Sequence, residues 1–127
     1  MTNDQHNQGD QDQRFPKQAR LLNQAQFDRV YQGKAYAADD TLVINGVLNE
    51  ESITRLGLSV SRKVGNAVVR NRWKRKIRDC FRRQKSDLPV GLDIVVRPRR
   101  GAKCDHAAIQ KSISNLVAKI HRRLNRA

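Results

Sequence analysis

Residues 64–83 read VGNAVVRNRWKRKIRDCFRR, and this stretch carries an apolar pattern and a basic pattern at once. At 100° per residue, apolar side chains share one arc of about 120°: Val69, Trp73, Ile77, Cys80 and Phe81. Polar and basic side chains share the opposite arc of about 100°: Asn71, Lys74, Arg75, Arg78 and Arg82. The stretch therefore predicts an amphipathic helix over 66–84, with one face for a core and one for a polyanion.

The charge of this stretch is almost entirely of one sign. Residues 62–83 contain ten Lys or Arg residues and one acid, Asp79. A helix face that is merely solvated usually mixes both signs in pairs four residues apart. The scarcity of acids, together with a net charge of +14 for the whole chain, favours a nucleic-acid partner.

The charge is also uneven along the chain. Residues 1–13 contain three aspartates and no Lys or Arg, so the remainder carries +17. Because this segment has no apolar residue beyond Met1, we predict a disordered polar tail over 1–13. Residues 14–127 are long enough for one domain with a modest core.

Upstream of the basic stretch the pattern predicts one helix and two strands. Asn23 with Gln26 matches a capping box and Gly33 ends the run, which predicts a short helix over 23–32. Residues 41–48 and 53–61 predict strands, with a bulge or turn at Asn45-Gly46. Because the connection between them is short, we expect them to pair as an antiparallel hairpin.

Downstream, the pattern predicts one strand and one helix. Residues 92–96 are apolar apart from Asp93 and predict a more buried strand, which Pro98 ends. Asp105 can cap a last helix whose apolar residues recur at three- and four-residue steps as far as Leu124. The residues alone thus predict the order αββαβα, an α+β domain with helices packed on a small sheet.

Catalytic and metal-binding patterns are weak. The acids outside the tail and the three histidines form no acid–base pair or nucleophile arrangement that we would assign to catalysis. Cys80 and Cys104 alone do not supply the four closely spaced ligands of a zinc site, so we predict no metal site. The chain has no signal-peptide pattern and no run of about 20 apolar residues, which predicts a cytoplasmic protein without a membrane partner.

Two aromatic residues leave two interpretations open. Phe27 and Tyr31 share one face of the first predicted helix, and their spacing alone is typical of core residues. They could instead form a partly exposed platform on which unpaired bases stack. Trp73 lies in the middle of the apolar arc and is predicted to be core.

The segment GLSVSRKVGNAVVRNRWKR, residues 57–75, resembles the signature of the bacterial ribonuclease P protein subunit family. The start FPKQARL, the helix with Phe27 and Tyr31, the strand DIVV and the last helix agree with that family in order and spacing, over about residues 14–124. The resemblance implies an αβββαβα sandwich with a mostly four-stranded sheet and a left-handed βαβ crossover, like domain 2 of ribosomal protein S5. It makes residues 14–127 a single RNA-binding α+β domain.

The resemblance also implies a function, namely assistance to a catalytic RNA that removes the 5′ leader from precursor tRNA. The catalyst would be the RNA, with Mg²⁺ held mainly by its phosphates, in a 1:1 complex with the protein and with no catalytic residue in the chain. Six residues would bind that RNA: Arg70, Asn71, Arg72, Lys74, Arg75 and Arg78. Four would bind the single-stranded leader: Phe27, Tyr31, Ser61 and Lys63. Some members carry an aromatic residue where Ile44 aligns, which implies weaker stacking here.

Three other classes use similar residues. A ribosomal or RNA-chaperone protein would bind structured RNA without a role in cleavage. A self-sufficient ribonuclease would cleave RNA without an RNA subunit. A DNA-binding protein fits the charge, but the region around Asn66 does not form a recognisable helix-turn-helix pair.

Overall fold

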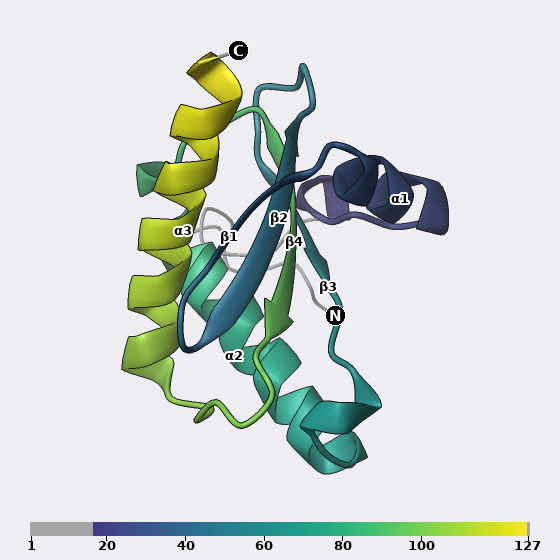
Figure 1. Cartoon of the computed structure of the whole chain (residues 1–127), viewed down its shortest axis with the longest axis vertical. Coiled ribbons are helices and arrows are strands. Elements are labelled where there is room, and N and C mark those ends of the chain that lie inside the picture. Colours follow the sequence, from purple (N-terminus) through teal and green to yellow (C-terminus); the bar gives the residue numbers. More distant parts are fainter. Residues whose placement is uncertain (1–16, 127) are drawn as a thin grey trace, which may run out of the picture.

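The structure is a computed structural model that describes residues 17–126, so the predicted tail over 1–13 lies outside the described residues. Figure 1 shows its helices and strands in the order αβββαβα. Their bounds are α1 (Gln24–Gln32), β1 (Ala35–Ala38), β2 (Leu42–Leu48), β3 (Arg55–Leu58), α2 (Ala67–Gln84), β4 (Leu92–Pro98) and α3 (His106–Arg126). Short 3-10 turns lie at Lys17–Ala19 (η2), Arg62–Val64 (η3) and Lys85–Asp87 (η4).

The three helices begin where the sequence predicts, because local caps fix their first turns. The Asn23 side chain accepts from the backbone N–H of Gln26 in a complete capping box. Asn66 accepts from Val69 N at 3.0 Å, and Asp105 accepts from Ala108 N at 2.9 Å. Each cap satisfies a backbone donor that the helix itself leaves without an acceptor.

The strands form one mixed sheet in the order β1-β2-β4-β3. β4 pairs antiparallel with β2 and parallel with β3, so the predicted hairpin between 41–48 and 53–61 is wrong. The physical reason is that β4 is apolar on both faces, with Leu92, Ile94, Val95 and Val96 all fully buried, and a central position covers both faces. The parallel pair is joined through α2, as parallel strands require.

Two further details of the sheet differ from the reading of the residues alone. β1 has the sequence AYAA and carries no strong strand pattern; only the family resemblance implied it. β2 continues through Asn45-Gly46 with regular pairing to β4, so there is no bulge or turn there. Gly46 instead lets α3 pack closely, because a Cβ at this position would lie 2.7 Å from Cγ2 of Ile120.

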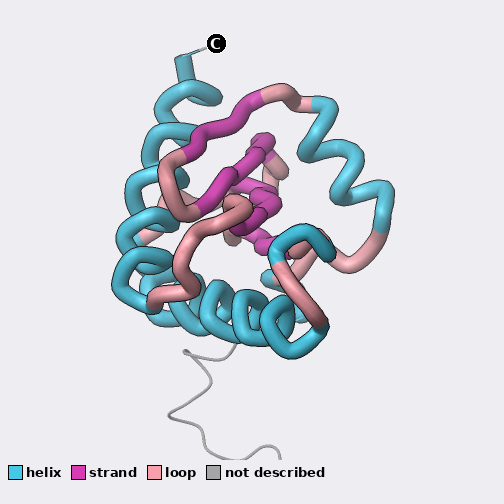
Figure 2. The backbone as a smooth tube through the Cα atoms, turned by 60° about the horizontal axis from the view of Figure 1, so that its bottom comes forward, coloured by secondary structure: helices cyan, strands magenta, loops and turns pink. Residues whose placement is uncertain are grey.

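The main core lies between the sheet and the pair α2 and α3, which Figures 1 and 2 place on the same side of the sheet. The apolar arc of α2 faces this core, and Trp73 is only 2% exposed, as predicted. α1 lies on the opposite side and packs on Val95 through Val30 and Phe27. No helix within residues 17–126 is long and apolar enough to cross a membrane.

Candidate nucleic-acid interface

The six residues predicted to bind RNA lie along the face of α2 that points away from the core. Four of the six are exposed: Asn71, Arg72, Arg75 and Arg78. Arg70 and Lys74 are half-buried, and Nη1 of Arg70 donates to the carbonyl oxygen of Gly65 at 3.0 Å, which ties the helix start to the preceding turn. Partial desolvation and the nearby Arg20 both lower the pKa of Arg78, so two cations lie close together on this flank of the helix.

Asp79, the one acid of the basic stretch, faces α3 and does not neutralise this face. Its carboxylate pairs with Arg82, with Nε of Arg83 at 3.0 Å and with Nε2 of His106 at 3.1 Å. The contact with His106 links α2 to the first turn of α3. Arg82, which the helical wheel grouped with the outward cations, is therefore drawn into a local ion pair.

These contacts make the free energy of unfolding depend on pH. Burial raises the pKa of Asp79, but hydrogen bonds from its three partners outweigh burial and lower the pKa from 3.8 to about 2. A carboxylate with a depressed pKa stabilises the fold fully above pH 3.8, and its contribution is lost as the pH falls through about 2.

We expect Asp79→Asn to lower the free energy of unfolding by about 1–2 kcal/mol at neutral pH, discounted for the partial exposure of the side chain. The difference from the unchanged protein should shrink toward pH 2. Urea unfolding across this pH range measures it, with the exposed Asp40→Asn as the control. An equal loss of stability at every pH would mean that the ion pairs are not its source.

Phe27 packs against the sheet beside the basic helix. A Cβ at Gly57 would meet Cζ of the Phe27 ring at 2.8 Å, so only glycine in β3 allows this contact. The ring is half-buried against Leu21 and Val95 and lines a hollow of about 160 Å³ together with Lys74 and Arg78. Phe27 is thus both a packing residue and the neighbour of two residues predicted to bind RNA.

Tyr31 lies one helical turn further along α1 and is 36% exposed. It lines a second hollow of about 530 Å³, which opens on the same side of the sheet as α1, over the part that α1 does not cover. Ser59 and Ser61 line the same hollow from the end of β3. Lys63 is exposed on the η3 turn, where its backbone N–H donates to Oγ of Ser61 at 3.1 Å, but it lines neither hollow.

The sequence reading missed part of this second hollow. Its remaining walls are Val43 from β2 and a run at the end of β4: Arg97, Pro98, Arg99 and Arg100. Strand alternation from Val95 would have placed Arg97 on the same face. Ile44 is fully buried in the main core and does not line this hollow, so the weaker stacking expected from Ile44 does not follow here.

A buried carboxylate, also missed, holds α1 in place over the sheet. Asp93 of β4 is 1% exposed and accepts from Nε and Nη2 of Arg55, both at 2.7 Å. It also accepts from Nδ2 of Asn49 at 2.8 Å and from Nη1 of Arg29, a residue of α1, at 3.2 Å. The hydrogen bond to Asp93 raises the pKa of Arg55. This network joins α1, and with it Phe27 and Tyr31, to two strands.

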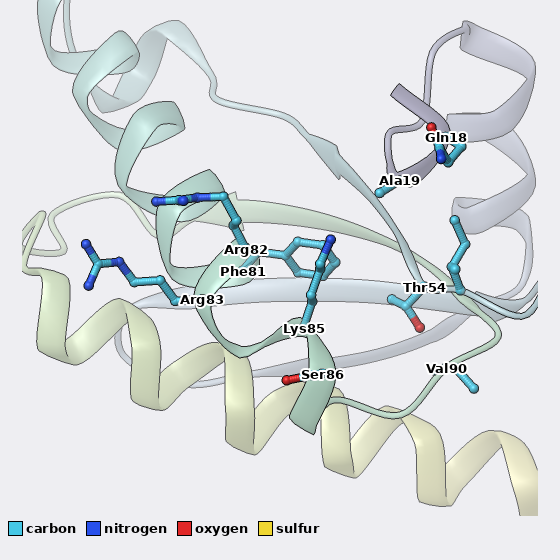
Figure 3. Close-up of a pocket in the computed structure, with 10 residues that line it drawn as sticks. Gln18, Ala19, Thr54, Phe81, Arg82, Arg83, Lys85, Ser86 and Val90 are labelled. Atoms are coloured by element: carbon cyan, nitrogen blue, oxygen red, sulfur yellow. The ribbon is translucent and has the colours of Figure 1, made fainter. Parts of the chain in front are cut away.

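A third hollow, of about 600 Å³, lies at the C-terminal end of α2. Figure 3 shows Phe81, Arg82, Arg83 and Lys85 on one side of this hollow and Ala19 and Thr54 on the other. Within residues 17–126, no group of three or more His, Cys, Asp or Glu residues is arranged to hold a metal ion.

Comparisons with known proteins agree with this architecture. The Ribonuclease P family model matches residues 15–121. A ribonuclease P protein component of Brevibacillus brevis is 42% identical over 100 residues, which cover 77% of this chain and 79% of the relative.

Two solved structures extend the likeness to the fold. The RNase P protein of Staphylococcus aureus is 39% identical with a TM-score of 0.71, over 82% of this chain and 95% of that one. The RNase P protein of Thermotoga maritima is 31% identical with a TM-score of 0.73, over 79% of this chain and 96% of that one. The chain therefore belongs to the ribonuclease P protein family.

Proposed function

We propose that this protein binds the ribonuclease P RNA through the basic face of α2. We propose further that it binds the single-stranded 5′ leader of precursor tRNA in a cleft beside α1, formed by the hollows at Phe27 and Tyr31. As a member of its family the protein is a subunit of an endoribonuclease of tRNA 5′ processing, with the RNase P RNA as its partner. The observation that carries the finer proposal is the placement of the exposed cations of α2 next to a partly uncovered sheet face beside the exposed ring of Tyr31.

The basic face suits folded RNA. Arg72, Arg75 and Arg78 are exposed, and Asp79, the one acid of residues 62–83, is engaged with other partners. Guanidinium groups can donate to two phosphate oxygens at once, and each neutralised phosphate releases counterions. Affinity that falls steeply with salt follows from this arrangement.

The cleft suits an unpaired strand. Tyr31 offers a ring face for stacking, worth about 1–3 kcal/mol per base, and the cations around it can follow a phosphate backbone. Phe27 and Lys74 line the neighbouring hollow, so a strand crossing both hollows would pass beside the helix that binds the RNA subunit. Duplex RNA would gain less here, because its bases are already stacked on each other.

The Mg²⁺ ions of the reaction belong, in this proposal, to the RNA. The protein would assist by screening phosphate repulsion with its +17 body, so that the RNA folds and holds its ions at lower Mg²⁺. We propose a 1:1 complex of protein and RNA.

The decisive experiment is cleavage of precursor tRNA at low Mg²⁺ by a bacterial ribonuclease P RNA, with and without the protein, beside a protein-only reaction. We expect cleavage only when both components are present, and a lower Mg²⁺ requirement than for the RNA alone. An unchanged Mg²⁺ requirement would contradict the screening role. RNA binding without any stimulation would favour the ribosomal or chaperone alternative, which the relatives do not favour.

A further inference from the structure

Arg97 holds an unusual position on the open face of the sheet. Among the side chains that the structure describes, its Nε is the one buried nitrogen or oxygen without a hydrogen-bond partner. A buried donor without an acceptor costs about 1–3 kcal/mol, and native proteins rarely leave one. The position therefore calls for an explanation other than packing.

The contacts that Arg97 does make are all with uncharged groups. Its Nη2 donates to Oδ1 of Asn45 at 3.0 Å, and its Cζ lies 5.8 Å from the centre of the Tyr31 ring. Within residues 17–126 no carboxylate pairs with it. Asn45 and Tyr31 thus fix the guanidinium in one orientation while leaving its charge uncompensated.

Two arginines near the same face of the sheet, one from α1 and one from β3, are held differently. Arg29 and Arg55 both donate to Asp93, which lies four residues before Arg97 and on the same side of β4. Those two arginines have a structural role that their carboxylate explains. Arg97 carries the same guanidinium group but has no carboxylate partner.

Because Nε itself is buried, a ligand would reach the part of the Arg97 side chain that lines the hollow beside Tyr31. Arg97 lines the hollow of about 530 Å³ together with Tyr31, two serines and the exposed Arg99 and Arg100. An aromatic ring, hydroxyl groups and several guanidinium groups in one hollow of small-ligand size suit a nucleotide. The oxygens of a nucleotide are hydrogen-bond acceptors, and its negative charge is opposite to that of the arginines that line the hollow.

We propose that Arg97 is a specificity-determining residue for the leader, and that it donates to an acceptor oxygen of a leader nucleotide whose base stacks at Tyr31. This inference rests on the proposed leader cleft. The acceptor is a phosphate oxygen or a base carbonyl, each of which accepts a hydrogen bond from a guanidinium N–H. Asn45 and Tyr31 act as positioning residues, because they hold the guanidinium where the nucleotide arrives.

The test compares dissociation constants of the complete RNA–protein complex for precursor tRNA with a leader and for the same tRNA without one. We expect Arg97→Met to weaken binding of the leader-bearing substrate about tenfold, the equivalent of one charge-assisted hydrogen bond, and to leave leaderless tRNA unchanged. Arg122→Met removes the same charge from an exposed position on α3 and should change neither constant.

Two further variants separate recognition of the leader from packing. Asn45→Asp keeps Arg97 in place and gives it a carboxylate partner, so it should raise the melting temperature and still weaken leader binding. Arg97→Lys should not restore wild-type discrimination, because an ammonium lacks the planar fork that stacks on Tyr31. A purely structural role would instead lower the melting temperature in Arg97→Met without changing the ratio of the two constants.

Modified leaders identify the acceptor. A methylphosphonate at the contacted phosphate, or a base without its carbonyl at the contacted base, should weaken binding by the unchanged protein and have no further effect in Arg97→Met. If the unchanged protein and Arg97→Met discriminate equally between tRNA with and without a leader, the role of Arg97 is wrong but the leader cleft still stands. If the unchanged complex binds both tRNAs equally, the leader cleft itself is wrong and the inference falls with it.

Discussion

Asp93→Ala should lower the free energy of unfolding by about 3–4 kcal/mol, since removal of one partner from a buried ion pair is strongly destabilising. The carboxylate is 1% exposed and accepts two hydrogen bonds from Arg55, one from Arg29 and one from Asn49. Without it the Arg55 side chain, only 22% exposed, keeps its charge but loses its counter-charge. Urea unfolding measures the loss, and the exposed Asp87→Ala is the control.

A functional consequence separates this network from ordinary packing. Because Arg29 belongs to α1, loss of Asp93 should loosen the helix that carries Tyr31 while the basic face of α2 stays intact. Asp93→Asn keeps the shape and should weaken leader binding more than binding of the RNA subunit. A loss below about 1 kcal/mol in Asp93→Ala would place the pair among surface ion pairs and contradict this account.

The helices were predictable from sequence because their signals are local. Asn23, Asn66 and Asp105 cap helices through contacts three residues away, and the apolar arc around Trp73 repeats within a single helix. The pairing of strands is not local. A hairpin was inferred from a short connection, whereas β4 pairs between β2 and β3 only after the chain has passed through α2.

The parts of the site that were missed depend on contacts between distant residues. Asp93 reads as one acid in an apolar strand, and its partners Arg29 and Arg55 lie 64 and 38 residues away. Arg97 meets Asn45 across 52 residues. The basic helix could be predicted because one turn after another repeats its pattern, but the cleft exists only once three strands and α1 are assembled.

The second large effect concerns the basic face of α2. The triple substitution Arg72→Ala, Arg75→Ala and Arg78→Ala should weaken binding of the ribonuclease P RNA by about 100-fold or more near physiological salt. It should also make the slope of log K against log salt shallower by about two to three, because each lost phosphate contact removes about 0.7–0.9. Alanine favours helix, so α2 itself should persist. Titration of the RNA at several salt concentrations gives both quantities.

A matched triple on α3 separates a defined interface from bulk charge. Lys111→Ala, Lys119→Ala and Arg122→Ala remove the same three charges from exposed positions on another helix. If the face of α2 is the interface, the α3 triple should keep most of the affinity and nearly the full salt slope. If both triples lose affinity equally, the +17 body attracts RNA without a preferred face, and the assignment of α2 is wrong. The long-range field alone is screened within about 8–10 Å at such salt, so contact with phosphates has to carry any difference between the two helices.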